Sequence, residues 1–163
     1  MQQAGITPAI RPVVDQANRL EEETGEPAMA IQLPDGRMVT GKTSDTLGAA
    51  SALLLNALKA VGGIGDQFEL ISAQVLEPVC RLKTQYLGHK NPRLHTDEVL
   101  MALTISALTN PLAELAQQQL PKLRGCDAHF TVILSEVDEN LLRRLGINVS
   151  CEARYETKKL YHK

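Results

Sequence analysis

A run of polar and ionisable side chains at residues 93–98 offers the most varied chemistry in this chain. Its candidate ligand-binding residues are Arg93, His95, Thr96, Asp97 and Glu98. They precede an apolar segment, and the amides at a helix start attract negative groups, to which Arg93 would add a positive charge. Because Asp97 and Glu98 would repel a bare phosphate, a small ligand with hydroxyl groups, such as a sugar or nucleoside, fits better. His95 could transfer a proton in such a site.

The same run also fits a purely structural interpretation. Thr96 has a typical N-cap side chain, and carboxylates in the first turn are favoured by the positive end of the helix dipole. In this case residues 93–98 would only start the following helix. Substitution separates the alternatives, because loss of Arg93 or His95 should cost little stability if these residues serve a ligand.

A second pattern, GxxxxGKT, has the spacing of a phosphate-binding loop. Its defined residues are Gly36, Gly41, Lys42 and Thr43. In such a loop the backbone amides surround a phosphate, and the Lys and Thr reach the phosphates and a magnesium ion. Here residues 37–40 are bulky and suited to a strand, and residues 34–36 have the composition of a turn, which favours a β-hairpin. A nucleotide-dependent hydrolase or transferase using these residues is therefore kept as the alternative function.

The sequence predicts no metal site and no cofactor. The three cysteines, Cys80, Cys126 and Cys151, form no CxxC pair, and their odd number indicates reduced thiols in the cytoplasm. Cys126 and His129 could supply two ligands, whereas zinc takes three or four from a protein. We find no signal-peptide pattern and no apolar run long enough to span a membrane, so we expect a cytoplasmic protein without a membrane partner.

Composition narrows the class of protein further. The 163 residues are 44% hydrophobic and 22% charged, which is typical of one globular domain with its own core. The net charge is −2, and aromatic residues make up 3% with no Trp. Because nucleic-acid binders use positive surfaces and stacking aromatic rings, no nucleic-acid partner is expected.

The elements that must position these residues can be predicted from apolar periodicity and turn residues. The predicted helices are residues 12–24, 44–61, 72–86, 99–108, 111–120 and 135–146, and the predicted strands are 28–33, 37–40, 68–71, 129–134 and 147–155. Strands joined by helices cross over right-handed and lie parallel. We therefore predict a three-layer α/β/α sandwich with a mixed sheet of about five strands, in which residues 129–134 are central.

A hairpin feeding a buried helix, followed by strand–helix units, resembles the cytidine deaminase topology. A deaminase would place its zinc ligands at the starts of two helices. The chain has Thr-Ser-Asp at residues 43–45 and Ser-Ala-Gln at residues 72–74 instead. The predicted fold is thus deaminase-like without the zinc motif.

Three long phrases, at residues 10–18, 90–100 and 155–163, resemble the bacterial family called domain of unknown function 1846, or uncharacterised protein family 0371. The resemblance covers almost the whole chain and implies the C-terminal part of a longer protein with a deaminase-like sandwich. Some family members carry the label of ATP-dependent peptidase. The resemblance brings no catalytic residues in support of that label.

These observations predict an organisation and a role. We expect an N-terminal linker and amphipathic helix at residues 1–27, the sandwich at 28–157, and a basic tail at 158–163. The helices at 44–61 and 99–108 are apolar nearly all round, so they need partners. We expect the N-terminal domains of the longer protein, a small-molecule ligand and a second copy as partners. The predicted role is structural or ligand-binding, without a catalytic constellation, and whether the protein is an enzyme stays open.

Overall fold

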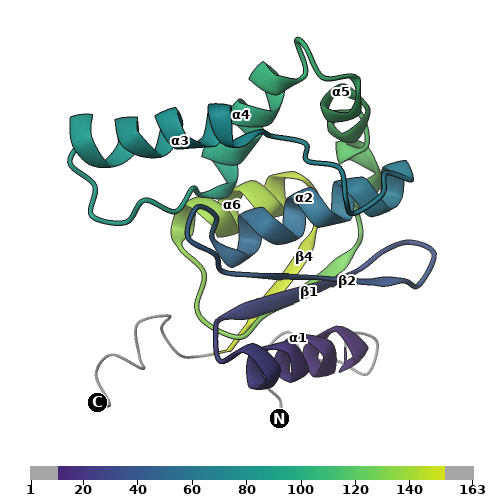
Figure 1. The fold of residues 1–163 in the computed structure, drawn as a ribbon. Coiled ribbons are helices and arrows are strands. Elements are labelled where there is room, and N and C mark those ends of the chain that lie inside the picture. The colour runs from purple at the N-terminus through teal and green to yellow at the C-terminus, as the bar shows by residue number, and fades with distance from the viewer. Residues whose placement is uncertain (1–10, 153–163) are drawn as a thin grey trace.

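The protein is built on one mixed four-stranded sheet (Figure 1). The computed structural model describes residues 11–152. The strands are β1 (Ala28–Gln32), β2 (Met38–Lys42), β3 (Asp127–Phe130) and β4 (Asn148–Cys151), in the spatial order β2-β1-β3-β4. Strand β1 runs antiparallel to β2 and β3, and β3 runs parallel to β4. The predicted hairpin is confirmed, and β3 lies inside the sheet as predicted.

Helices cover both faces of the sheet, which confirms the predicted α/β sandwich (Figure 1). On one face lies α1 (Arg11–Thr24), and on the other lie α2 (Ala49–Gly62) and α6 (Glu136–Arg144). Outside α2 and α6 is a further helical layer. It contains α3 (Ala73–Arg81), a π-helix (Leu82–Tyr86), α4 (Thr96–Ser106), α5 (Pro111–Gln117) and a short 3-10 helix (Leu120–Leu123). No helix in the described part is long and apolar enough to cross a bilayer.

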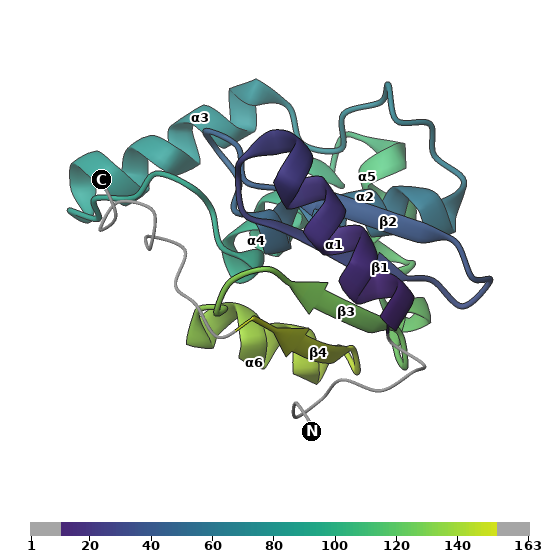
Figure 2. The same ribbon diagram turned by 90° about the horizontal axis from the view of Figure 1, so that it is seen from below.

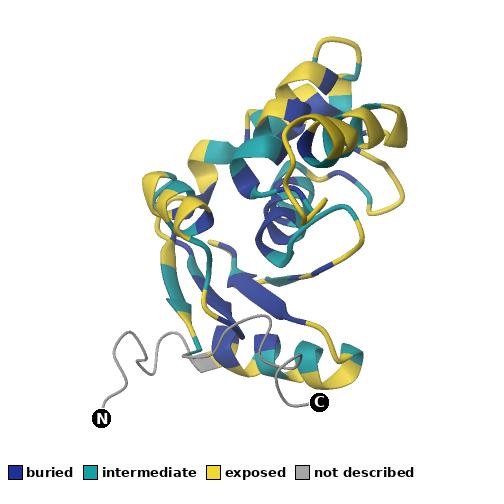
Figure 3. Ribbon diagram, turned by 90° about the vertical axis from the view of Figure 1, so that its left-hand side faces the viewer, coloured by how far each residue is buried: buried dark blue, intermediate teal, exposed yellow. Residues whose placement is uncertain are grey.

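The sequence of β1 explains how one strand serves two cores. Met29 and Ile31 point to the α2 side and join the large apolar cluster, whereas Ala30 points to the opposite face. There Ala30 packs with Val13 and Ala17 of α1 in a smaller cluster. The buried residues gather in the sheet and on the helix faces next to it (Figure 3).

The predicted strand at residues 68–71 is wrong. These residues form an irregular segment before α3, in which Leu70 and Ile71 are buried. The Asn110 side-chain amide donates a hydrogen bond to the Leu70 carbonyl, at 3.5 Å. The residues are apolar because they are buried beneath the outer helices, and not because they form a strand. A short apolar run alone does not distinguish a strand from a buried loop.

The boundaries of β3 and α2, among others, also differ from the prediction. Strand β3 begins at Asp127 and ends at Phe130, and residues 131–134 leave the sheet for α6, with Thr131 accepting a hydrogen bond from the Ala28 amide. Helix α2 begins at Ala49, because Ser44 closes a local turn with Leu47 instead of capping the helix.

Some of the other predictions about organisation concern the described residues, and some concern residues outside them. Four strands are present in residues 11–152, and the deaminase-like topology and the domain boundaries stay predictions. Residues 1–10, the end of the predicted last strand and the basic tail at 158–163 lie outside the described residues.

Candidate functional site

Three helix N-termini meet at a small cavity of about 70 Å³. Helix α2 reaches it at Gly48, α4 at His95 and α6 at Ser135. Its polar lining consists of Thr43, Asn91, Arg93, His95, Ser135 and Asp138. The cavity therefore joins part of the predicted site at residues 93–98 to α6, a helix 40 residues later in the chain.

Asp138 is the centre of the polar network beside this cavity. It is only 8% exposed, and its carboxylate accepts hydrogen bonds from the Thr96 amide at 2.8 Å and the Thr96 hydroxyl at 2.7 Å. Its second oxygen lies 3.2 Å from His95 Nδ1. A carboxylate from α6 thus satisfies the start of α4, where the helix dipole favours negative charge.

The contacts between His95 and Asp138 shift both pKa values. The hydrogen bond from His95 to Asp138 raises the pKa of the imidazole above its usual 6.5, against the opposing effect of its partial burial. Burial by itself raises the pKa of Asp138, but the hydrogen bonds from His95 and Thr96 outweigh it and leave that pKa below 3.8. Both shifts therefore favour the charged form of the group, so the charged pair persists over a wider pH range than it would for two isolated side chains.

Glu98 and Lys83 extend the network toward the π-helix. Glu98 Oε1 accepts hydrogen bonds from the His95 amide at 2.8 Å and from Lys83 Nζ at 3.0 Å. Lys83 is 4% exposed, and its ammonium group also donates to the Arg93 carbonyl. A buried ammonium group needs hydrogen-bond and charge partners, and the Glu98 carboxylate and the Arg93 carbonyl supply them for Lys83.

The loop that carries Arg93 is attached to the start of α2. Arg93 Nε donates to the Ser44 carbonyl at 2.6 Å, and the Asn91 side chain accepts from the Arg93 amide at 2.9 Å. The Leu94 carbonyl accepts from the buried Ser51 hydroxyl at 2.8 Å. These bonds hold Arg93 and His95 in a defined position beside the cavity.

The structure separates the five predicted ligand-binding residues by accessibility. Arg93 and His95 line the cavity and are partly exposed, whereas Thr96 is fully buried against Asp138. Glu98 faces Lys83, and the Asp97 carboxylate accepts from the Glu98 amide at 2.8 Å. The suggestion that Thr96 is the N-cap is wrong, because His95 occupies that position and Thr96 is the first helical residue.

The sequence reasoning missed Asp138 and Lys83. In the sequence, Asp138 looks like an ordinary acidic residue in the first turn of α6, and Lys83 looks like one of several charged residues along a helix. The only signal for Lys83 is its position on the stripe otherwise occupied by Val75, Leu76 and Val79. Nothing in the local sequence of α6 indicates that Asp138 meets α4, because that contact depends on the tertiary fold.

The GxxxxGKT residues do not form a phosphate-binding loop in this structure. Gly36 lies in the hairpin turn, and Gly41 and Lys42 belong to β2, which pairs with β1. A Cβ atom at Gly41 would lie 2.4 Å from the Leu53 amide nitrogen, so this glycine allows β2 to approach α2. Thr43 is buried six residues before α2 begins. This arrangement lacks the loop of free amides at a helix start that phosphate binding uses.

The larger depression beside β2 has no buried carboxylate among its lining residues. It measures about 570 Å³ and lies between β2 and the C-terminal end of α2. Lys59 Nζ donates to the Asp66 carbonyl, Asn56 to the Thr40 carbonyl, and Arg37 to Asp35. The smaller cavity combines the buried Asp138 with the partly exposed His95, so it is the better candidate site.

A second buried polar cluster lies between β3 and β4. His129, 1% exposed, has Nδ1 at 2.8 Å from the Ser150 hydroxyl and Nε2 at 2.8 Å from the Glu152 carboxylate. Both ring nitrogens are therefore engaged, which leaves neither free to pair with Cys126 in a metal site. No group of three or more His, Cys, Asp or Glu side chains in the described part of the chain could hold a metal ion.

Comparisons with known proteins identify relatives along the whole chain. The family model described as "Domain of unknown function DUF1846, C-terminal" matches residues 9–161. A UPF0371 protein of Corynebacterium efficiens is 53% identical, one of Corynebacterium diphtheriae is 50% identical, and one of Streptococcus pyogenes is 45% identical. Each alignment covers 100% of this chain and 33% of the relative. The chain thus spans about a third of the length of the curated relatives that it matches, and the predicted family resemblance is confirmed.

Proposed function

Because the chain belongs to the family described as "Domain of unknown function DUF1846, C-terminal", we propose that it is the C-terminal domain of a longer cytoplasmic bacterial protein and forms one wall of a small-molecule site. One observation carries the proposal: the partly exposed His95, held by the buried Asp138, lines a small cavity together with Arg93. Surface residues rarely combine a buried carboxylate, a positioned imidazole and a cation in this way.

The free groups of the cavity favour a ligand with hydroxyl groups. The Asp138 carboxylate is occupied by Thr96 and His95, and the Asn91 side-chain oxygen by the Arg93 amide. The groups left for a ligand are His95 Nε2, the outer nitrogens of Arg93, the Asn91 side-chain nitrogen and the hydroxyl groups of Thr43 and Ser135. These groups both donate and accept hydrogen bonds, as sugar or nucleoside hydroxyl groups require.

The size of the cavity indicates that other parts of the protein complete the site. Small-molecule sites usually enclose about 300–1,000 Å³, whereas this cavity measures about 70 Å³. An adjoining depression of about 500 Å³ shares Asn91 and Arg93 with it and is also lined by Asp45 and Lys90. The relatives are about three times as long as this chain, so the remaining two thirds can supply the missing walls.

The test is ligand binding by the full-length family protein that carries this domain. We expect a sugar or nucleoside from a screening panel to raise the melting temperature, because a ligand at 100 times its dissociation constant stabilises the native state by about 2.7 kcal/mol. His95→Gln and Arg93→Gln should abolish this shift while changing the melting temperature of the free protein only slightly.

Matched control variants separate binding from stability. His89→Gln and Arg37→Gln change the same residue types at exposed or partly exposed positions that do not line the cavity, and they should keep the ligand shift. The proposal is wrong if the two pairs of variants respond alike, or if no panel compound binds the full-length protein.

The other functions considered have no observation of their own in their favour. A nucleotide-dependent hydrolase or transferase would need Gly41 and Lys42 in a loop, and both belong to β2. Self-association stays a prediction.

A further inference from the structure

Helix α3 and its continuation form an arm that extends from the body of the domain (Figures 1 and 2). We define the arm as residues 73–87: α3, the π-helix Leu82–Tyr86, and Leu87. Within these fully described elements no residue of α3 is completely buried, and in the π-helix only Lys83 is buried. The arm therefore gains less from burial in this domain than an ordinary outer helix does.

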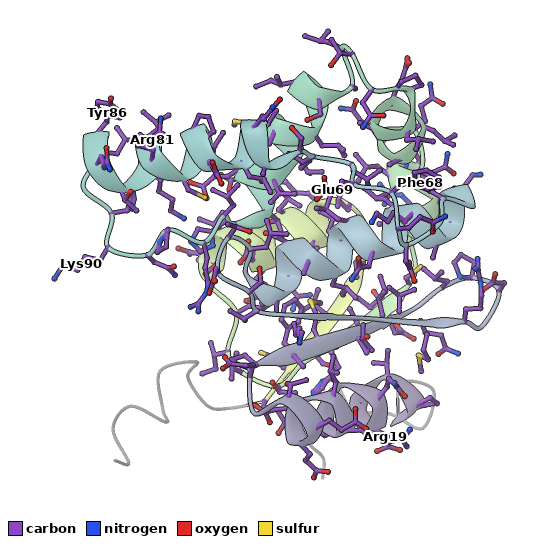
Figure 4. All side chains as sticks on the ribbon, in the orientation of Figure 1. Arg19, Phe68, Glu69, Arg81, Tyr86 and Lys90 are labelled. Carbon is purple, nitrogen blue, oxygen red and sulfur yellow. The ribbon has the colours of Figure 1, made fainter. Side chains whose placement is uncertain are left out.

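Exposed apolar side chains concentrate on the arm and on its neighbour α4. Six of the ten large hydrophobic side chains exposed in the described part lie on the arm, on α4 or directly after it. They are Leu82, Tyr86, Leu87, Met101, Ile105 and Leu108. Tyr86 is 74% exposed and stands near the far end of the arm (Figure 4), and Leu108 is 83% exposed. Concentrated apolar surface of this kind marks an interaction site.

The spacing on α4 adds to this argument. Met101 and Ile105 are four residues apart, so they lie on one face of the helix, and the exposed Leu108 follows in the turn directly after it. The opposite face of α4 holds the fully buried Val99 and Leu103. Helix α4 thus has two apolar faces, one inside this domain and one without a partner in the described part.

The arm is also held in a fixed position. The buried ammonium group of Lys83 bonds to Glu98 of α4 and to the Arg93 carbonyl, at the point where the arm reaches its exposed end. A buried charged pair restricts the arm, because breaking it would leave a charge unpaired. The exposed apolar side chains are therefore presented on a preformed surface, which lowers the entropy lost on docking.

We propose that the arm and the exposed face of α4 dock against the remaining two thirds of the family protein. The relatives carry this extra length, covalently joined to the same chain. A joined segment meets this surface at an effective concentration of about 1 mM, far above that of a free second copy at ordinary protein concentrations. The joined segment is therefore expected to occupy the surface in preference to a second copy. This inference does not depend on a ligand binding beside His95.

Radical footprinting of the full-length family protein tests the proposal. Each side chain's oxidation rate is compared with its rate in the same protein unfolded in urea, at low and high protein concentration. We expect Tyr86 and Met101 to be oxidised several-fold more slowly in the dilute folded protein than their exposure in this domain predicts. Phe68, also exposed but on the loop before α3, is the internal reference (labelled in Figure 4).

Two outcomes overturn the proposal. If Tyr86 and Met101 react as exposed side chains at every concentration, nothing covers the surface. If their protection requires high protein concentration, the partner is a second copy and not the rest of the chain.

Substitution gives an independent measurement in the full-length protein. Tyr86→Ser and Met101→Ser remove apolar side chains that are exposed in this domain, so the domain itself should keep its fold. We expect limited proteolysis to release the domain several-fold faster from these variants than from wild type, whereas Phe68→Ser should behave as wild type. Equal release from all four proteins contradicts the docking proposal.

Discussion

At the scale of single residues, the charge state of His95 links the candidate site to stability. The folded-state pKa of His95 lies above its usual 6.5, and that of Asp138 lies below 3.8. A raised histidine pKa contributes stability that is complete below the unfolded value and is lost as the pH rises through the folded pKa. A lowered aspartate pKa contributes stability that is lost as the pH falls through the folded pKa. The pair therefore stabilises the domain most between these limits.

We predict that His95→Gln flattens the pH dependence of stability above pH 6.5. The glutamine keeps a hydrogen-bond donor beside Asp138 but carries no charge, so the loss that wild type shows as the imidazole deprotonates should disappear. The difference should be below about 1 kcal/mol, because His95 is 38% exposed and solvent screens the pair. Urea unfolding from pH 5 to 8.5, followed by circular dichroism since the chain lacks Trp, measures it.

The comparison of the two proteins isolates His95. All other titratable groups are present in both, so only the contribution of His95 differs between their pH profiles. Identical pH profiles for wild type and variant would show that the His95–Asp138 pair does not contribute charge-dependent stability.

At the scale of elements, one ion pair connects the arm to α4. Lys83 of the π-helix and Glu98 of α4 are 3.0 Å apart, and Lys83 is buried. We predict that Glu98→Gln destabilises the domain, because its amide oxygen can still accept a hydrogen bond but no longer balances the buried ammonium charge. Removing one partner of a buried pair costs about 3–5 kcal/mol, and the partial exposure of Glu98 reduces the expected loss to about 2 kcal/mol.

A double-mutant cycle distinguishes this pairing from general disruption. In Lys83→Met the buried cation is absent, so adding Glu98→Gln should cost much less than it does in wild type. Denaturant unfolding of the four proteins measures the coupling. Additive losses would mean that the two charges do not stabilise each other.

The elements also show what local sequence can and cannot predict. Helix α5 was predictable because Asn110 and Pro111 are a cap and a first-turn residue, and Asn110 does accept from the Leu112 amide. The false strand at residues 68–71 has the same apolar composition as a real one, and only its burial beneath α5 explains it. Apolar periodicity indicates which residues are buried, but a short apolar run does not indicate which elements cover them.

At the scale of the whole molecule, the candidate site depends on contacts between distant segments. Arg93, His95 and Glu98 were predictable because polar side chains before an apolar helix stand out in the sequence. Asp138 was not, because it comes from α6 and reaches α4 only through the packing of both helices on one side of the sheet. The predicted run at residues 93–98 is thus half of a network whose other half is set by the fold.

The two faces of the sheet also differ in how strongly they are covered. Helix α2 adds residues such as Leu53, Leu54 and Leu58 to the large cluster, whereas α1 packs through Val13, Val14 and Ala17 in a separate small one. Burial of one such large side chain contributes about 1.5–3 kcal/mol. Because α1 has few of them, it should open at a lower free energy than the rest of the domain.

We predict that α1 unfolds as a separate unit before global unfolding. Native-state hydrogen exchange at low urea should give the α1 amides a lower opening free energy than those of α2 and β1. Ala17→Gly should lower the α1 value by about 1 kcal/mol, because glycine is a weaker helix former, and the global free energy measured at α2 by the same amount, because global unfolding includes the opening of α1. The fully buried Ala57 of α2 supplies the matched substitution, Ala57→Gly, which should lower the α2 value and leave the α1 value unchanged, because α2 stays folded when α1 opens alone. If Ala57→Gly instead lowers α1 and α2 equally, the sheet and both of its covering layers form one cooperative unit.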